Sequence, residues 1–216
     1  SIFGWKNEDG YRRYRKAYCK VSRKNGKTEL AGGIGLYGFL MDGENTPEIY
    51  TAATKKKQAK IAFDVMATML ASLIKDSKHI AKLIKETNKH SVIKSDGGFI
   101  NYLGKDSDTE DGSNPHFGII DEYHAHPDSD ILKVIETGMG SRRQPLVFII
   151  TTAGMNKKIV CNDFEKDVCQ QVLKGSKKNE ALFCIMFDLD NSEDWTDRTQ
   201  WIKANPNIGD SPLWAY

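Results

Sequence analysis

The sequence has few prolines and glycines and no long apolar run, which are the features of fibrous, disordered and membrane proteins. Only 6 prolines and 18 glycines occur among 216 residues, which excludes collagen-like and low-complexity chains. No apolar run approaches the roughly 20 residues that a membrane-spanning helix needs, and the first residues lack a signal-peptide pattern. A hydrophobic content of 39% is enough for a full core. Because the sequence begins without Met, we expect a globular part of a longer protein.

Cysteine is also scarce, with four residues at no metal-ligand spacing: Cys19, Cys161, Cys169 and Cys184. We expect reduced thiols in a cytosolic protein.

Neither sign of charge is in excess, because 31 basic and 29 acidic residues give a formal net charge of +2. That value excludes a polycationic coat for nucleic acid. The local distribution is uneven. Residues 11–28 carry eight basic residues and no acidic one, whereas residues 105–130 carry eight acidic residues against Lys105 alone. The first segment suits a polyanion, and the second suits a metal or a cationic partner.

Hydrophobic periodicity predicts alternating strands and helices. We expect strands over 18–22, 47–53, 91–94, 99–103, 117–120, 146–150 and 181–187. We expect helices over 27–41, from an N-cap at Thr54 through residue 73, and over 77–85, 130–139 and 159–173. Several strands are apolar throughout, which predicts an α/β fold with a mostly parallel sheet covered by helices on both faces. Residues 105–115 are expected to form a loop. Residues 1–187 are expected to form the domain, and 188–216 a linker with one short helix over 196–203.

The strongest local motif lies between the first strand and the first helix. A tight glycine turn precedes a helix that begins at Lys27-Thr28. Backbone N–H groups and the helix N-terminus of such a turn bind phosphate. Lys27 would reach the β and γ phosphates, and the Thr28 hydroxyl would ligate Mg²⁺. The usual pattern G-x-x-x-x-G-K-[ST] has Gly where this chain has Val21. The expected nucleotide-binding residues are Ser22, Arg23, Lys24, Asn25, Gly26, Lys27, Thr28 and Glu29.

A second motif follows the apolar strand 117–120, where Asp121 and Glu122 are adjacent carboxylates. Because consecutive strand residues point to opposite faces, the two should have different roles. We assign Asp121 to the metal and Glu122 to general base or water positioning. His124 and His126 follow closely, and we expect them to orient neighbours or pack rather than bind a metal.

A third motif follows the most hydrophobic strand. Small hydroxyl residues there would lie beside the γ-phosphate and sense it; the segment comprises Thr151, Thr152, Ala153 and Gly154. The first two motifs, in this order within an alternating α/β chain, predict a P-loop nucleoside triphosphatase of the RecA or ASCE type.

Taken together, these segments resemble the large terminase subunit of tailed bacteriophages. The resemblance runs over residues 3–209 and is carried by SRKNGKT at 22–28, IIDEYHAH at 119–126, RRQPL at 142–146, TTAG at 151–154 and KANPN at 203–207. That family uses a deviant loop with a basic residue just after its start, so Val21 is consistent with the match.

The resemblance implies an ATPase domain that drives double-stranded viral DNA into capsids, with ATP and Mg²⁺ as cofactors. The implied partners are viral DNA, the small terminase subunit, the capsid portal and further copies of the chain in a ring. No membrane is involved, and the implied location is the cytoplasm of the infected bacterial host. Arg23 would contact the γ-phosphate and join Glu122 and Lys27 as a catalytic residue. Residues 151–154 would couple hydrolysis to movement, and Arg142 or Arg143 would supply an arginine finger.

Two other functions share parts of this pattern. A strand-separating helicase would have the same loop, Asp-Glu pair and Thr-Thr-Ala segment, but 216 residues leave little room for its second RecA-like domain. A nucleotide-dependent assembly module would need no base at Glu122. No nuclease activity is expected, because the family's cluster of metal-binding carboxylates has no counterpart in this sequence.

Overall fold

A computed structural model describes residues 2–104, 112–154, 159–190 and 192–212. Its strands form one sheet in the order β3-β4-β5-β2-β6-β7-β1-β8. Their bounds are Lys16–Lys20 (β1), Glu48–Ala52 (β2), Ile84–Thr87 (β3), Val92–Lys94 (β4), Phe99–Leu103 (β5), Phe117–Ile120 (β6), Leu146–Thr151 (β7) and Leu182–Met186 (β8). Every neighbouring pair is parallel except β3–β4 and β4–β5. The prediction of a mostly parallel sheet is confirmed.

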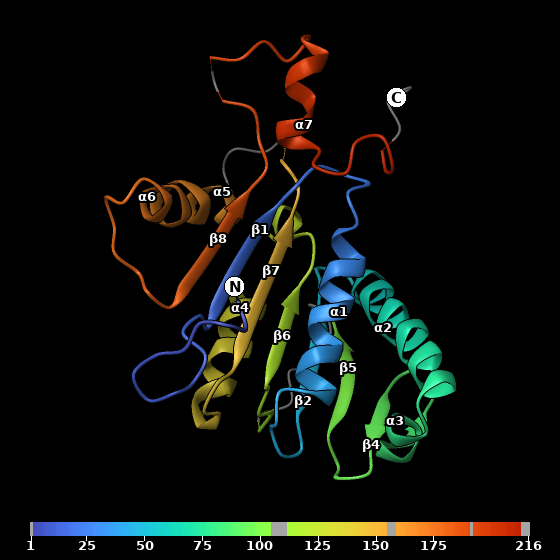
Figure 1. Ribbon diagram of the computed structural model, residues 1–216. Helices are drawn as coiled ribbons and strands as arrows, with labels where there is room; N and C mark the ends of the chain where they lie inside the picture. The colour runs from blue at the N-terminus through green and yellow to red at the C-terminus, as the bar shows by residue number, and fades with distance from the viewer. Residues whose placement is uncertain (1, 105–111, 155–158, 191, 213–216) are drawn as a thin grey trace.

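Helices cover both faces of this sheet (Figure 1). One face is covered by α1 (Lys27–Leu40) and α2 (Lys56–Asp76). The other is covered by α4 (Asp130–Gly138) and by α5 (Val160–Phe164), which continues through a π-helical turn (Glu165–Cys169) into α6 (Gln170–Leu173). The remaining helices are α3 (Lys78–Leu83), α7 (Trp201–Ala204) and 3-10 turns at Tyr123–Ala125, Met139–Ser141 and Arg198–Gln200. Among the described residues, no helix is both long and apolar enough to cross a membrane.

Small residues bring α1 unusually close to the sheet. A Cβ placed on Gly38 would lie 2.5 Å from the Phe117 ring, and one on Gly35 would lie 2.8 Å from Ile119. Phe117 and Ile119 are fully buried and belong to β6. Side chains larger than hydrogen at these positions would push the helix outward. The close packing fixes how the second half of α1 lies against β6.

Several predicted boundaries differ from the structure. The first strand ends at Lys20 instead of continuing to residue 22, which leaves residues 21–26 free to form a loop. Thr54 is not an N-cap, because α2 begins at Lys56 after Lys55. The helix predicted over 77–85 ends at Leu83, and its last two predicted residues begin the polar edge strand β3. Of the loop expected over 105–115, residues 105–111 lie outside the described residues.

Candidate nucleotide-binding site

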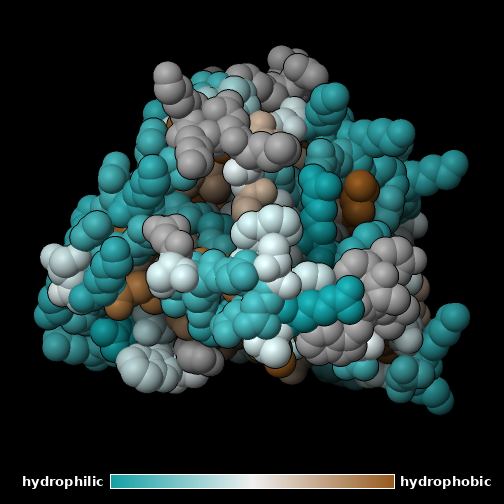
Figure 2. All heavy atoms as spheres, turned by 90° about the horizontal axis from the view of Figure 1, so that it is seen from above, coloured by the Kyte–Doolittle hydropathy of each residue, from teal (hydrophilic) through white to brown (hydrophobic). Residues whose placement is uncertain are grey.

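The loop between β1 and α1 lies at the edge of the sheet where the parallel strands end (Figure 1). Lys24 and Gly26 both adopt left-handed backbone, with φ of 65° and 71°. Glycine adopts this conformation without steric cost, which explains its presence immediately before the helix. The loop curls back at these positions and turns its backbone toward the N-terminus of α1, the arrangement that suits phosphate. Viewed from above in Figure 2, this end of the molecule is mainly hydrophilic.

A cavity of about 540 Å³ opens beside the loop. It is lined by Arg23, Lys24, Gly26, Lys27, Thr28, Glu29, Glu122, Asn207 and Ser211. Six of the eight predicted nucleotide-binding residues therefore surround one space, together with the predicted base. The other two, Ser22 and Asn25, hydrogen-bond to each other within the loop. Asn25 is buried and donates to the backbone oxygens of Ser22 and Arg23 at 3.2 and 3.1 Å.

The Lys27 amine is the buried cation of the site. Its Nζ donates to the backbone oxygen of Ser22 at 3.4 Å. Burial lowers the pKa of Lys27, while the charges of Glu122 and Asp121 oppose that shift. The amine thus lies between the loop and the two carboxylates, where phosphate oxygens would complete its hydrogen bonding.

The two carboxylates differ in environment, as the sequence predicts. The cause is their different burial and neighbours, and not the alternation of side chains along a strand. Asp121 is buried, and burial followed by the charge of Glu122 raises its pKa to about 6. Glu122 has left-handed backbone with φ of 49°, so the alternation of a strand ends before it. Contact with His124 lowers the pKa of Glu122, against the opposing effect of burial. Glu122 therefore stays ionised to lower pH than Asp121, and it lines the cavity.

The donor set fits Mg²⁺. A buried carboxylate whose pKa is raised by desolvation is relieved by a nearby cation, and Asp121 is such a group. Thr28 supplies a hydroxyl that lines the cavity. Among the described residues, no three His, Cys, Asp or Glu side chains gather as they would in an all-protein metal cage. Mg²⁺ in phosphate sites commonly has few protein ligands, and Thr28 and Asp121 are the residues that would hold it here.

The predicted coupling segment lies beside the carboxylates but outside the nucleotide cavity. Thr151 and Thr152 are buried at the end of β7, and Ala153 and Gly154 are exposed. Thr152, Ala153 and Gly154 line a separate space of about 70 Å³ together with His124 and Lys20. The link between the two spaces is His124, which contacts Glu122 on one side and Thr151 on the other.

The carboxyl-terminal segment contributes residues to the site that sequence reasoning assigned to a linker. The Asn207 backbone N–H donates to Asn25 Oδ1, and the Asn207 side chain donates to the Asn25 backbone oxygen, both at 3.1 Å. Asn25 Nδ2 donates to Asn205 Oδ1 at 3.1 Å, and Ser211 Oγ to the Lys24 oxygen at 2.6 Å. The KANPN motif at 203–207 was a usable signal, but nothing in it indicates which loop it contacts.

The two arginine-finger candidates lie at the opposite end of the strands from the nucleotide loop, just before β7 begins. Arg142 is buried and donates to the backbone oxygens of Asn45, Thr46 and Asn114 and to Glu44. It cannot reach the loop of its own chain from there, and its donors are occupied, so Arg142 is a structural residue in this arrangement. Arg143 is exposed, and it is the candidate that remains available to a neighbouring subunit.

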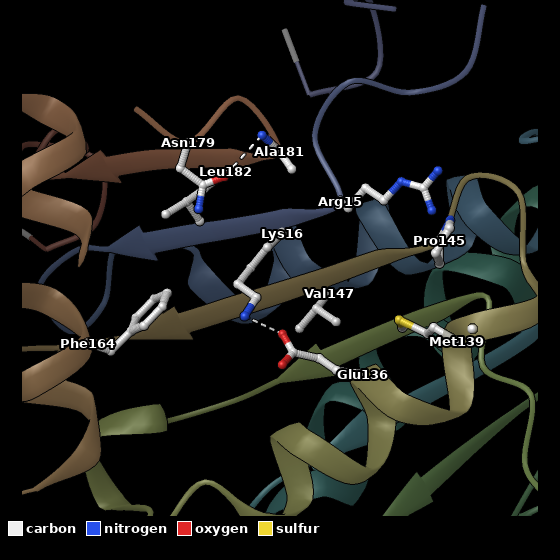
Figure 3. Close-up of a pocket in the computed structure, with 11 residues that line it drawn as sticks. Arg15, Lys16, Glu136, Met139, Pro145, Val147, Phe164, Asn179, Ala181 and Leu182 are labelled. Carbon is white, nitrogen blue, oxygen red and sulfur yellow. Dashed lines mark hydrogen bonds and ion pairs between the residues drawn. The ribbon is translucent and has the colours of Figure 1, made fainter. Parts of the chain in front are cut away.

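A further hollow, of about 340 Å³, lies on the sheet face that α4 covers, between β1, β8 and α4 (Figure 3). Val147 and Leu182 point into it from the sheet, and a Lys16–Glu136 ion pair crosses it. No predicted site residue lines this hollow.

Comparison with known proteins agrees with this geometry. Residues 1–170 match the family model described as terminase large subunit, ATPase domain. The chain belongs to this family. It is 25% identical to the terminase large subunit of Enterobacteria phage HK97 over 197 residues, which are 89% of this chain and 37% of that protein. It is also 48% identical over 99 residues to the protein YmfN of Escherichia coli K12, covering 46% of this chain and 22% of YmfN.

Solved structures of terminases share the fold. The crystal structure of the HK97 large terminase superposes with a TM-score of 0.76 at 23% identity, over 91% of this chain and 40% of that one. The large terminase of a thermophilic bacteriophage, in complex with ADP, gives a TM-score of 0.57 at 16% identity, over 88% of this chain and 44% of that one. The ATPase domain of this chain is thus a P-loop fold. The chain spans less than half the length of these relatives.

Proposed function

We propose that this terminase ATPase domain hydrolyses ATP at the loop of residues 22–29 and uses the energy to move double-stranded viral DNA into a capsid. The observation that carries the proposal is the cavity in which Lys27, Thr28 and Arg23 meet Glu122. A phosphate-binding loop and an ionised carboxylate around one space are what hydrolysis of a nucleoside triphosphate needs.

Each residue of the site has a role in this proposal. Lys27 and Arg23 stabilise the negative charge of the phosphates, and backbone N–H groups of residues 24–28 bind phosphate oxygens. Glu122 orients the attacking water and accepts its proton. Its lowered pKa keeps the carboxylate ionised at neutral pH, as a base must be. Thr28 and Asp121 would hold Mg²⁺, which neutralises phosphate charge when bound. Thr151 to Gly154 transmit the state of the site to the rest of the chain.

The proposed partners follow from family membership. They are double-stranded viral DNA, the small terminase subunit, the capsid portal and further copies of this chain in a ring on that portal. In that ring Arg143 would act on the nucleotide of a neighbouring subunit. The protein would work in the cytoplasm of the infected bacterial host. We expect no nuclease activity from the residues present here, and the division at residue 187 into an ATPase domain and a linker remains a prediction.

ATP turnover by the wild type and by Glu122→Gln, each with and without duplex DNA, tests the proposal. We expect the variant to lose about 10²-fold or more in kcat, with its fold and its ATP affinity retained. Stimulation of the wild type by duplex would connect hydrolysis to DNA movement. Equal turnover in both proteins would contradict the role of Glu122. Unwinding of a forked duplex would favour a helicase, and tight ATP binding without turnover in the assembled ring would favour an assembly module.

Lys27→Ala separates binding from chemistry in the same assay. We expect ATP affinity to fall at least about tenfold, because the variant loses the cation that faces the phosphates. Lys57→Ala is the matched control, since Lys57 is exposed on α2. Unchanged ATP affinity in Lys27→Ala would show that the cavity is not the nucleotide site.

A further inference from the structure

His124 occupies the space between the two carboxylates and the end of β7. Its Nδ1 lies 3.1 Å from Glu122 Oε2 and 3.2 Å from Thr151 Oγ1. Its backbone N–H donates to the same Thr151 hydroxyl at 3.0 Å. Thr152 Oγ1 lies 3.5 Å from Nδ1. One ring nitrogen therefore faces the predicted base and both hydroxyls of the predicted coupling segment.

The hydrogen bonds of Thr151 determine which group donates. A hydroxyl has one hydrogen and two lone pairs. Thr151 Oγ1 is placed to donate to the Thr152 backbone oxygen at 3.1 Å, and the Glu122 carboxylate, 3.1 Å from Nδ1, offers lone pairs alone, so a hydrogen on Nδ1 satisfies both neighbours. The partners therefore assign a hydrogen to His124 Nδ1. Ionised Glu122 offers only acceptors, and its Oε2, 3.1 Å from Nδ1, is buried without a hydrogen-bond partner in the part of the chain that the structure describes. The N–H on Nδ1 therefore has two alternative acceptors, the Thr151 hydroxyl and the Glu122 carboxylate.

The position of His124 is tightly constrained by its surroundings. A Cβ on Gly154 would lie 3.2 Å from His124 Cβ, so the coupling segment packs directly against the histidine. Thr151 is also the residue whose backbone oxygen accepts from Val21, at the start of the nucleotide loop, at 3.1 Å. A continuous set of contacts thus runs from the loop through Thr151 and His124 to Glu122.

We propose that His124 is a positioning residue for ATP hydrolysis, which holds the Glu122 carboxylate and joins it to Thr151 through a shared Nδ1 hydrogen. The inference rests on the proposed function and adds a residue to it. When Glu122 turns toward the attacking water, the N–H of His124 is released to Thr151. When Glu122 turns back, the N–H returns to it. The Glu122 carboxylate and the Thr151 hydroxyl then compete for one donor. Movement of either acceptor therefore changes the hydrogen bonding of the other.

Four variants test this pairing in the full chain, each assayed for kcat, KM and affinity for a non-hydrolysable ATP analogue. We expect His124→Ala to lower kcat about tenfold or more, with the affinity for the analogue changed less than about twofold. We expect His124→Asn to retain most of the turnover, because the Asn Nδ2 occupies the place of Nδ1. We expect His124→Gln to behave like His124→Ala, since its donor is one methylene farther out. His79→Ala, on the exposed helix α3, is the matched control.

Thr151→Val provides the second half of the test. It removes the hydroxyl at nearly constant shape, and we expect a kcat loss comparable to that of His124→Ala. The double variant should be no slower than the slower single variant, because the two residues act through one hydrogen bond. Losses that multiply, wild-type turnover in His124→Ala, or no rescue by a folded His124→Asn would each overturn the inference. Should Glu122→Gln retain full turnover, the proposed function itself would fail, and that result is read independently of the His124 series.

Discussion

At the residue scale, Asp121 is placed where its charge destabilises the fold. It is 5% exposed, beside the ionised Glu122, and its pKa is raised to about 6 from an ordinary value of 3.8. A carboxyl with a raised pKa binds its proton more tightly when the protein is folded. Stability is therefore unaffected below pH 4, falls as the pH rises through 4 to 6, and stays reduced above that. Such a cost is typical of a residue retained for function.

We therefore predict that Asp121→Asn stabilises the metal-free protein. The amide carries no charge, and its Oδ1 can still accept from the Glu122 N–H, as Asp121 Oδ1 does at 2.8 Å. The expected gain is about 1–2 kcal/mol at pH 8, and it should vanish near pH 4. Thermal melts in EDTA at the two pH values measure it, and Mg²⁺ should stabilise the wild type but not the variant. A variant less stable than wild type at pH 8 would contradict the raised pKa.

The sequence predicts residues whose role is set by near neighbours, and misses those set by distant ones. The loop and the Asp121–Glu122 pair are short patterns, and the structure brings the loop and Glu122 to one cavity, with Asp121 buried next to it in the chain. The contact of Asn207 with Asn25 joins residues 182 positions apart, and no local pattern encodes it. The sequence offers Arg142 and Arg143 equally as finger candidates. They are distinguished by the burial of Arg142 among backbone oxygens, which becomes visible only in three dimensions.

At the scale of elements, the glycines of α1 differ in their surroundings, and only some of them face the sheet. Gly38 faces the Phe117 ring, whereas a Cβ on Gly33 would meet nothing within 4 Å. Both residues lie in the same helix, and glycine costs helix stability at either position. The helix tolerates this cost at Gly38 because no larger residue fits between it and the sheet.

We predict opposite effects for the same substitution at these two positions. Gly38→Ala should destabilise the fold by about 1–3 kcal/mol through overpacking against Phe117. Gly33→Ala should stabilise it by up to about 1 kcal/mol, since it adds helix propensity without a clash. Urea unfolding of the two variants with wild type measures both. Equal changes in the two would mean that α1 packs less closely than this structure indicates.

Sequence patterns predict where a helix lies better than they predict its hydrogen-bonding geometry. The helix expected over 159–173 exists, but five of its residues, Glu165–Cys169, form a wider π-helical turn. Glu165 within that turn accepts from Tyr18 Oη at 3.0 Å and from Lys20 Nζ at 2.9 Å. These are partners on β1, so the local geometry of the helix depends on a strand that periodicity within the helix cannot reveal. Strand β3 was missed because it is short, polar and at the edge of the sheet.

At the scale of the whole molecule, the end of the chain returns to the beginning of the domain. Asn205, Asn207 and Ser211 contact the loop that also forms the nucleotide cavity. A change in the loop on nucleotide binding would thus be transmitted directly to the segment that follows the sheet.

We predict that Asn25→Ala releases this segment. The variant removes the acceptor of the Asn207 N–H, so amide exchange at Asn207 should accelerate about fivefold, which corresponds to about 1 kcal/mol. Asn88→Ala is the matched control, because Asn88 accepts from His90 and Ser91 in a turn between β3 and β4. It should accelerate exchange at those two amides only. Unchanged exchange at Asn207 in Asn25→Ala would show that other contacts hold the segment.

The order of strands in the sheet also constrains how the protein is made. Strand β1 is flanked by β7 and β8, with Lys16 opposite Val147 and Leu182. At roughly 5 to 20 residues per second, a ribosome needs on the order of ten seconds after β1 before both flanking strands have been synthesised. Strands β2, β5 and β6 pair with one another and are complete earlier. The phosphate-binding loop thus emerges first but gains its supporting neighbours last, so a nascent chain acquires its nucleotide site only near the end of the domain's synthesis.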